Sequence, residues 1–170
     1  MERVFFEKYH ALQTDIDNEC SRLELMHKGQ MKCGIGCDSC CESLTLFPIE
    51  YFYIKANIEI FNNLPKNRLL NSLTKACRFL VNGKCTIYEF RPIICRTQGL
   101  PLLYENNKGT GFELSVCRLN FKNVDISVFN TENALYMPPF TSRLFLLNKE
   151  FVENNFNGKY KPVDRLKLNK

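Results

Sequence analysis

The sequence predicts a mainly α-helical fold with small β-hairpins, built as a single domain. Several stretches carry apolar residues three or four positions apart, which is the spacing of an amphipathic helix. Two short apolar runs flank Asn82-Gly83, the strongest local signal for a hairpin. The length of 170 residues fits one domain, and a chain of this size buries about 70% of its unfolded surface.

The N-terminal helix is expected over residues 3–28, followed by Gly29 as its end. Its apolar residues form one stripe. The stripe consists of Phe5, Tyr9, Leu12, Ile16, Cys20 and Leu23. Cys20 is therefore interpreted as a small core residue and not as a ligand, since free cysteines are usually buried.

Three further helices are expected. One begins at Pro48, which suits a first helical turn, and ends before Pro65. A short helix then runs from Pro65 to about Ala76, and the last helix covers residues 138–155 with an apolar face.

The β structure is expected to be limited to two hairpins. The first surrounds Asn82-Gly83, and the second covers residues 100–117 around a looser Gly-rich turn. Residues 1–156 are expected to form the one domain, and residues 157–170 a basic tail without a periodic pattern.

The charge is concentrated in that tail. The formal net charge is +5, and the tail carries five Lys or Arg residues against one Asp. A nearly neutral body excludes a generally basic nucleic-acid binder, and no DNA-binding motif is present. The tail cations are candidate contacts for a protein or RNA partner. They are Lys159, Lys161, Arg165, Lys167 and Lys170.

The cysteine content indicates metal binding in a reducing compartment. Nine cysteines are many for a chain of this size, and their odd number fits a full set of disulfides poorly. The N-terminus lacks the apolar segment of a secretory signal, and no stretch approaches the roughly 18 apolar residues of a membrane span. A cytoplasmic location is expected, where clustered cysteines more often bind metal.

Eight of the cysteines fall into two groups of four, with the patterns C-x3-C-x2-C-C and C-x7-C-x9-C-x21-C. The first group is Cys33, Cys37, Cys40 and Cys41, and the second is Cys77, Cys85, Cys95 and Cys117. Four thiolates complete the shell of a tetrahedral zinc ion or of a [4Fe–4S] cluster. An iron–sulfur cluster or zinc is therefore the expected cofactor, and the domain is expected to be organised around it.

The adjacent pair Cys40-Cys41 leaves the arrangement open, because neighbouring side chains diverge. One site with spare thiols, two sites, or one metal beside a reactive Cys41 are all compatible with the sequence. A thiolate centre needs donors and cations around it, and Arg91 and Arg96 flank Cys95 in positions suited to that role.

The cysteine pattern resembles the YkgJ-type cysteine-cluster family. Residues 77–96 match the family pattern C-x-F-L-x-x-G-x-C-x-I-Y-x-x-R-P-x-x-C-R, after a CxxCC-like block. The matched region runs from about Cys33 to Cys117, half of the chain. The resemblance implies a metal or iron–sulfur centre held by these cysteines, and it implies less about activity.

The sequence therefore predicts a metal-binding protein whose centre is structural or redox-active, with an accessory subunit of a larger assembly as one such role. The alternative is an iron–sulfur oxidoreductase, or a thiol- or methyl-transfer enzyme that uses a reactive cysteine beside the metal. His10 and His27 are the only histidines, and no Gly-rich dinucleotide loop or HExxH motif is present. Acid–base machinery is thus scarce, and whether the chain is an enzyme stays open.

Overall fold

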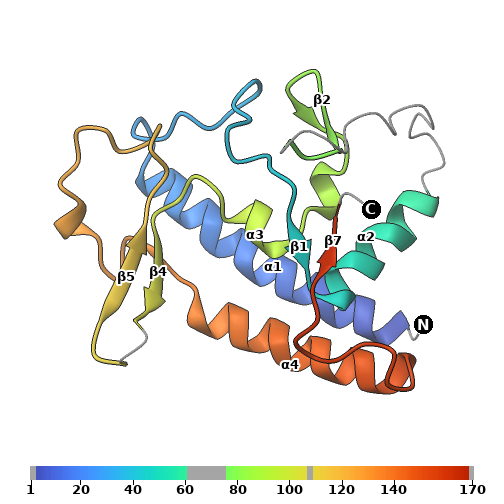
Figure 1. Cartoon of the computed structure of the whole chain (residues 1–170). Coiled ribbons are helices and arrows are strands. Elements are labelled where there is room, and N and C mark those ends of the chain that lie inside the picture. Colours follow the sequence, from blue (N-terminus) through green and yellow to red (C-terminus); the bar gives the residue numbers. More distant parts are fainter. Residues whose placement is uncertain (1–2, 61–75, 107–108, 169–170) are drawn as a thin grey trace.

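The computed structural model describes residues 3–60, 76–106 and 109–168. Its α-helices are α1 (Arg3–Met26), α2 (Pro48–Ile60), α3 (Ile93–Arg96) and α4 (Pro138–Asn155), and its 3₁₀ helices are η1 (Tyr88–Phe90) and η2 (Ile126–Val128). Its strands are β1 (Thr45–Leu46), β2 (Leu80–Val81), β3 (Lys84–Cys85), β4 (Leu102–Glu105), β5 (Phe112–Ser115), β6 (Leu135–Tyr136) and β7 (Leu166–Lys167). The predicted fold class, mainly α with small β elements, is confirmed (Figure 1).

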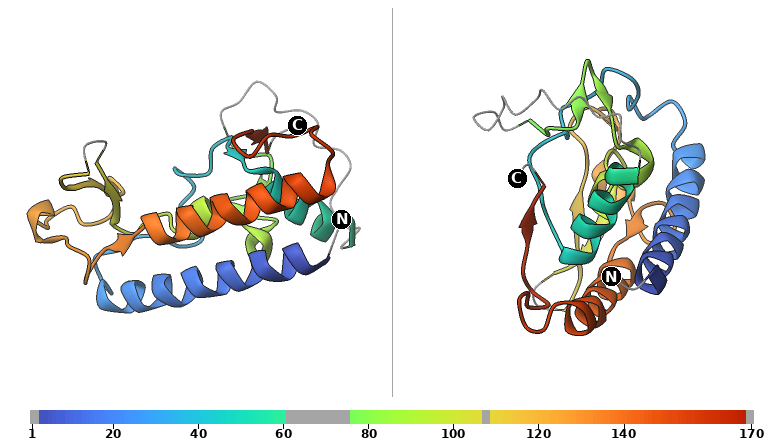
Figure 2. Two further views of the ribbon diagram at one scale, coloured as in Figure 1. Left: turned by 90° about the horizontal axis from the view of Figure 1, so that it is seen from below. Right: turned by 90° about the vertical axis from the view of Figure 1, so that its right-hand side faces the viewer.

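The two long helices form the base of the molecule. α1 and α4 run antiparallel and side by side (Figures 1 and 2), and α2 packs against both. Phe5 of α1 meets Phe151 of α4 edge-on, with ring centroids 5.7 Å apart. Cys20 is 5% exposed and belongs to the same core, as the apolar stripe predicts. Burial raises the pKa of Cys20 to about 12. Its place in the helical core, and not its pKa, sets it apart from the clustered cysteines.

The helix bounds follow the sequence signals closely. α1 ends two residues before the expected end of the 3–28 helix, α2 begins at Pro48, and α4 covers residues 138–155 as expected. The expected helix from Pro65 to about Ala76 falls almost entirely on residues 61–75, which lie outside the described part of the chain. None of the described helices combines the length and the apolarity needed to cross a membrane.

Both predicted hairpins are present. β2 and β3 pair across Asn82 and Gly83, which have φ values of 51° and 71°. Two consecutive positive φ values are typical of a type I′ turn, the geometry that an Asn-Gly pair favours. β4 pairs with β5 in the second hairpin, and β6 joins β4 in parallel to complete a three-stranded sheet. A two-residue strand such as β6 has too few residues for a readable alternation.

The C-terminal segment packs against the body. β7 pairs antiparallel with β1, directly after the first cysteine block, with Leu166 opposite Leu46. Leu168 is 4% exposed and belongs to a cluster with Leu46, Ile54 and Ile87. The Asn148 side chain of α4 donates to the carbonyl oxygen of Pro162 at 2.8 Å. From the sequence these residues appear only as a basic tail, because the pairing is short and joins segments about 120 positions apart.

Replacing Leu168 is expected to destabilise the protein. Leu168→Ala should lower the free energy of unfolding by about 2–3 kcal/mol, at the low end for a buried leucine because a chain end can readjust. The matched control is Lys167→Ala at the exposed neighbouring position, which should stay within about 0.5 kcal/mol of the native protein. Urea unfolding followed by circular dichroism measures both, and equal midpoints would contradict the packed position of Leu168.

Candidate metal centre

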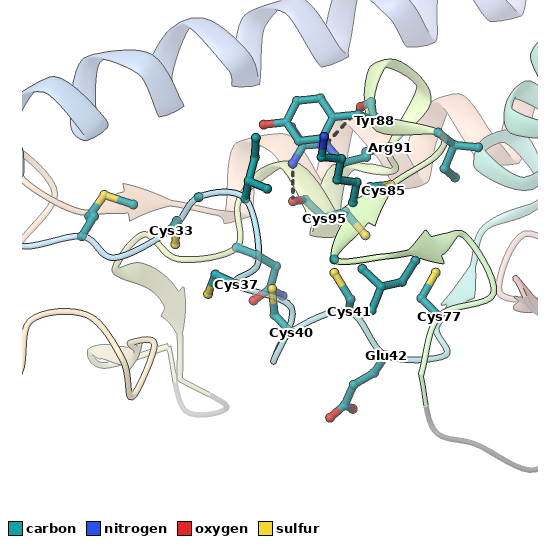
Figure 3. A pocket seen from close by; sticks show the side chains of 18 of the residues that line it. Cys33, Cys37, Cys40, Cys41, Glu42, Cys77, Cys85, Tyr88, Arg91 and Cys95 are labelled. Carbon is teal, nitrogen blue, oxygen red and sulfur yellow. Dashed lines mark hydrogen bonds between the residues drawn. The ribbon is translucent and has the colours of Figure 1, made fainter.

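Seven of the eight clustered cysteines line one pocket of about 720 Å³. The lining thiols are Cys33, Cys37, Cys40, Cys41, Cys77, Cys85 and Cys95. They come from the loop after α1, the β2–β3 hairpin and α3 (Figure 3). The structure therefore brings together thiols up to 62 positions apart in the chain, as a shared centre requires.

Backbone contacts join the adjacent pair Cys40-Cys41 (the doublet) to the segment of the β2–β3 hairpin. The amide of Cys77 donates to the carbonyl oxygen of Cys41 at 2.9 Å, and Glu42 forms a β-bridge with Ala76. The amide of Leu80 donates to the carbonyl oxygen of Cys77 at 3.1 Å. Leu80 in turn lies opposite Cys85 in the β2–β3 pair. These backbone contacts therefore hold three cysteines close together in the fold: Cys41, Cys77 and Cys85.

Asn120 and Gly99 surround Cys33, at the end of the site away from the β2–β3 hairpin. Neither residue was predicted from the sequence. Asn120 is 3% exposed, and its side-chain amide donates to the Cys33 Sγ at 3.3 Å and to the carbonyl oxygen of Gly99 at 2.7 Å. Its side-chain oxygen accepts from the Lys32 amide at 2.7 Å, and its own amide donates to the carbonyl oxygen of Cys117 at 3.1 Å. One buried side chain therefore links the segments that carry the first and the last clustered cysteine.

Position 99 requires glycine because of its backbone conformation and its close approach to Cys33. Its φ is +99°, and a Cβ atom at this position would lie 2.4 Å from the Cys33 Sγ. Only glycine adopts this backbone without strain and leaves room for the thiol. A glycine three residues after the Cys95-Arg96 pair could have signalled a tight approach, whereas no sequence signal marked Asn120.

The two predicted arginines have different surroundings. Arg91 lines the pocket, stacks on the Tyr88 ring at 3.5 Å from its centroid, and donates to the carbonyl oxygen of Cys95 at 3.4 Å. Its charge can offset that of bound thiolates. Arg96 is not among the lining residues: it pairs with Asp17 of α1 and donates to the carbonyl oxygen of Glu89. Arg96 therefore anchors the segment that carries Cys95 to α1.

The buried carboxyl group of Glu50 also supports the segment that carries Cys95. It is 3% exposed and accepts hydrogen bonds from the Tyr9 hydroxyl at 3.3 Å and from the amides of Phe47 and Ile93, both at 3.2 Å. Its carboxylate thereby connects α1, the start of α2 and the start of α3. Burial raises the pKa of Glu50, although these donors and the charge of Arg165 oppose the shift.

The raised pKa of Glu50 predicts a pH-dependent stability. A carboxyl whose folded-state pKa is raised favours the folded protein at low pH, and this contribution is lost as the pH rises through the folded-state pKa. Glu50→Gln should therefore gain stability relative to the native protein as the pH rises from about 4.5 to 7. Urea unfolding of both proteins across this range measures the difference. Both keep the same cysteines, so any metal effect cancels, and a constant difference would contradict the prediction.

The thiols of Cys41 and Cys95 are not activated as nucleophiles. Burial, and then the neighbouring Cys40, Cys77 and Cys85, raise the pKa of Cys41 to about 11. Burial, and then Cys77 and Cys85, raise the pKa of Cys95 to about 12. Reactive cysteines instead have lowered pKa values, so Cys41 lacks the environment of a nucleophile. Metal binding would displace these protons, since thiolates are the ligands.

The donor set fits a sulfur-ligated metal. All nine cysteines are free thiols, and soft thiolates suit zinc and iron–sulfur clusters alike. His27 contacts the carbonyl oxygen of Asn133 at 2.6 Å and packs edge-on against Phe121 and Phe129, and it is not among the residues that line the pocket. Within residues 3–60, 76–106 and 109–168, no three Cys, His, Asp or Glu side chains converge tightly enough to enclose one ion.

Residues 32–118, just over half of the chain, match the CxxCxxCC family model, whose description is "Putative zinc- or iron-chelating domain". The chain belongs to this family. The CxxCxxCC match begins one residue before Cys33 and ends one residue after Cys117, so it contains all eight clustered cysteines and excludes Cys20. It agrees with the cysteine-cluster resemblance and supports a cysteine-rich metal-binding protein. No curated protein and no solved structure matches the chain.

Proposed function

We propose that this CxxCxxCC protein holds an iron–sulfur centre of the [4Fe–4S] type through its clustered cysteines, with zinc as the alternative. The observation that carries the proposal is a pocket lined by seven free thiols, all of which lie within the region that matches the family. Eight clustered cysteines are enough to supply the four thiolates that such a cluster requires.

The spacing of the thiols favours a [4Fe–4S] cluster over a single zinc ion. Sulfurs that share a zinc ion lie about 2.3 Å from the metal and hence within about 4 Å of each other. In a [4Fe–4S] cluster each thiolate binds a different iron, so the sulfurs stand farther apart. Among the described residues no three such ligands converge on one point, which agrees better with the wider spacing of sulfurs around a cluster.

The centre combines a structural with a redox role. Several separate chain segments carry its ligands, so a bound cluster would tie them together, and Cys33 and Cys40 at the pocket are exposed to solvent. An exposed cluster can exchange electrons with a docked partner, as an oxidoreductase or an accessory subunit does. The thiol-transfer alternative is disfavoured by the raised pKa of Cys41.

Location and partner belong to the same proposal. Nine free thiols fit the reducing cytoplasm. The exposed lysines at 159, 161 and 167 are proposed to contact an acidic partner, either protein or RNA, whereas Arg165 stacks on the Phe47 ring at 3.4 Å from its centroid. Lys170 lies outside the described residues. Replacing these three lysines by glutamate tests the contact without removing Leu168. Unchanged association in pull-down and RNA-binding assays would contradict it.

Anaerobic purification tests the metal assignment. The protein should be brown, with broad visible absorption, and should contain iron and acid-labile sulfide in equal amounts. A colourless protein with stoichiometric zinc would overturn the iron–sulfur assignment, and a protein with neither metal would overturn the proposed function as a whole.

A further inference from the structure

We propose that the eight clustered thiols form two separate four-thiol centres and that the adjacent Cys40 and Cys41 belong to different ones. The inference rests on the proposed function that these thiols hold metal. The first set is Cys33, Cys37, Cys40 and Cys117, and the second set is Cys41, Cys77, Cys85 and Cys95. Neither set coincides with a sequence group, because Cys41 and Cys117 exchange places.

The second set is gathered by the β2–β3 hairpin. The Cys77 amide donates to the carbonyl oxygen of Cys41, and the Leu80 contacts place Cys77 next to Cys85. In Figure 3, Cys41, Cys77, Cys85 and Cys95 lie on one side of the pocket.

The first set is gathered by the loop after α1 and by Asn120. The Asn120 side chain donates to the Cys33 Sγ and its amide donates to the Cys117 carbonyl oxygen, which brings the two ends of the matched region together. Cys33 and Cys37 lie in one short loop, in which the Cys37 amide donates to the carbonyl oxygen of Gly34 at 3.0 Å.

The doublet is where the two sets divide. In Figure 3, Cys40 lies between Cys37 and Cys41, and Cys41 lies on the side of Cys77. Two turn hydrogen bonds hold the backbone of the pair: the Cys41 amide donates to the Asp38 carbonyl oxygen at 2.8 Å, and the Glu42 amide donates to that of Cys40 at 3.0 Å. Adjacent cysteines that would strain a single centre thus supply one ligand to each of two centres, and no clustered thiol is spare.

The number of metals in the native protein is the first test. Two [4Fe–4S] clusters give about eight irons per chain, and two zinc ions are expected if zinc is the occupant. About four irons, or one zinc, would overturn the division into two centres while leaving the proposed function intact. A chain without bound metal would instead overturn the proposed function.

Pairs of serine substitutions test which thiols belong together. Cys33→Ser with Cys40→Ser changes only the first set, Cys41→Ser with Cys95→Ser changes only the second, and Cys40→Ser with Cys95→Ser changes both. Each within-set pair should lose half of the metal, and the cross-set pair should lose all of it. Cys20→Ser controls for thiol loss outside the site and should keep the full amount. Equal losses for the within-set and cross-set pairs would contradict the division.

Discussion

Removing the metal is expected to loosen the cysteine-bearing loops and to leave the helical base folded. A metal present at about 1,000 times its dissociation constant stabilises a protein by about 4 kcal/mol. For a chain of this length the loss corresponds to a fall in Tm of about 8–16 °C. The base should remain, because the core between α1 and α4 is apolar and α4 contributes no residue to the pocket.

Hydrogen exchange of the native and the chelated protein locates the effect. Amides in residues 31–44, 77–88 and 116–121 should exchange faster after chelation, because these loops carry or border the thiols. Amides of α1 and α4 should keep their protection. Unchanged exchange in the loops would place the metal elsewhere, and a loss of protection throughout α1 and α4 would contradict an independent helical base.

Gly99→Ala is expected to displace Cys33 and to weaken metal binding in its set. The new methyl group would lie 2.4 Å from the Cys33 Sγ, a contact that the backbone or the thiol must relieve by moving. The positive φ adds a strain of about 1–2 kcal/mol for any residue with a side chain. Metal content and the free energy of unfolding should therefore both fall.

Gly158→Ala separates the two causes. Gly158 also has a positive φ, +81°, but a Cβ atom there would meet nothing within 4 Å. This variant should show the backbone strain alone and retain its full metal content. Metal analysis and urea unfolding of the two variants measure the comparison, and equal metal content would contradict the close approach of Gly99 to Cys33.

Local patterns made most of the fold predictable. The stripe from Phe5 to Leu23 predicted α1 and the burial of Cys20, and Asn82-Gly83 predicted the first hairpin. The pairing of β1 with β7 was not predictable, because each strand has two residues and no local pattern links the two. Its stability comes from the packing of Leu168, which is a tertiary effect.

The sequence singled out the cysteines of the candidate site and the two nearby arginines, but not the buried residues that hold the site together. Thiol chemistry and spacing mark cysteines in any context, so the sequence could indicate all eight. Asn120 and Glu50 act through hydrogen bonds to distant backbone groups, which only the fold brings near. Arg96 was named from the sequence, but its partner Asp17 lies 79 positions away on α1 and could not be predicted.

X-ray absorption at the metal edge tests most directly the central claim that cysteine thiolates hold the metal. The account predicts four sulfur neighbours per metal at about 2.3 Å, with a second shell of iron atoms if the occupant is a cluster. Nitrogen or oxygen ligands in place of sulfur, or a spectrum unchanged in a variant that lacks the clustered cysteines, would contradict it.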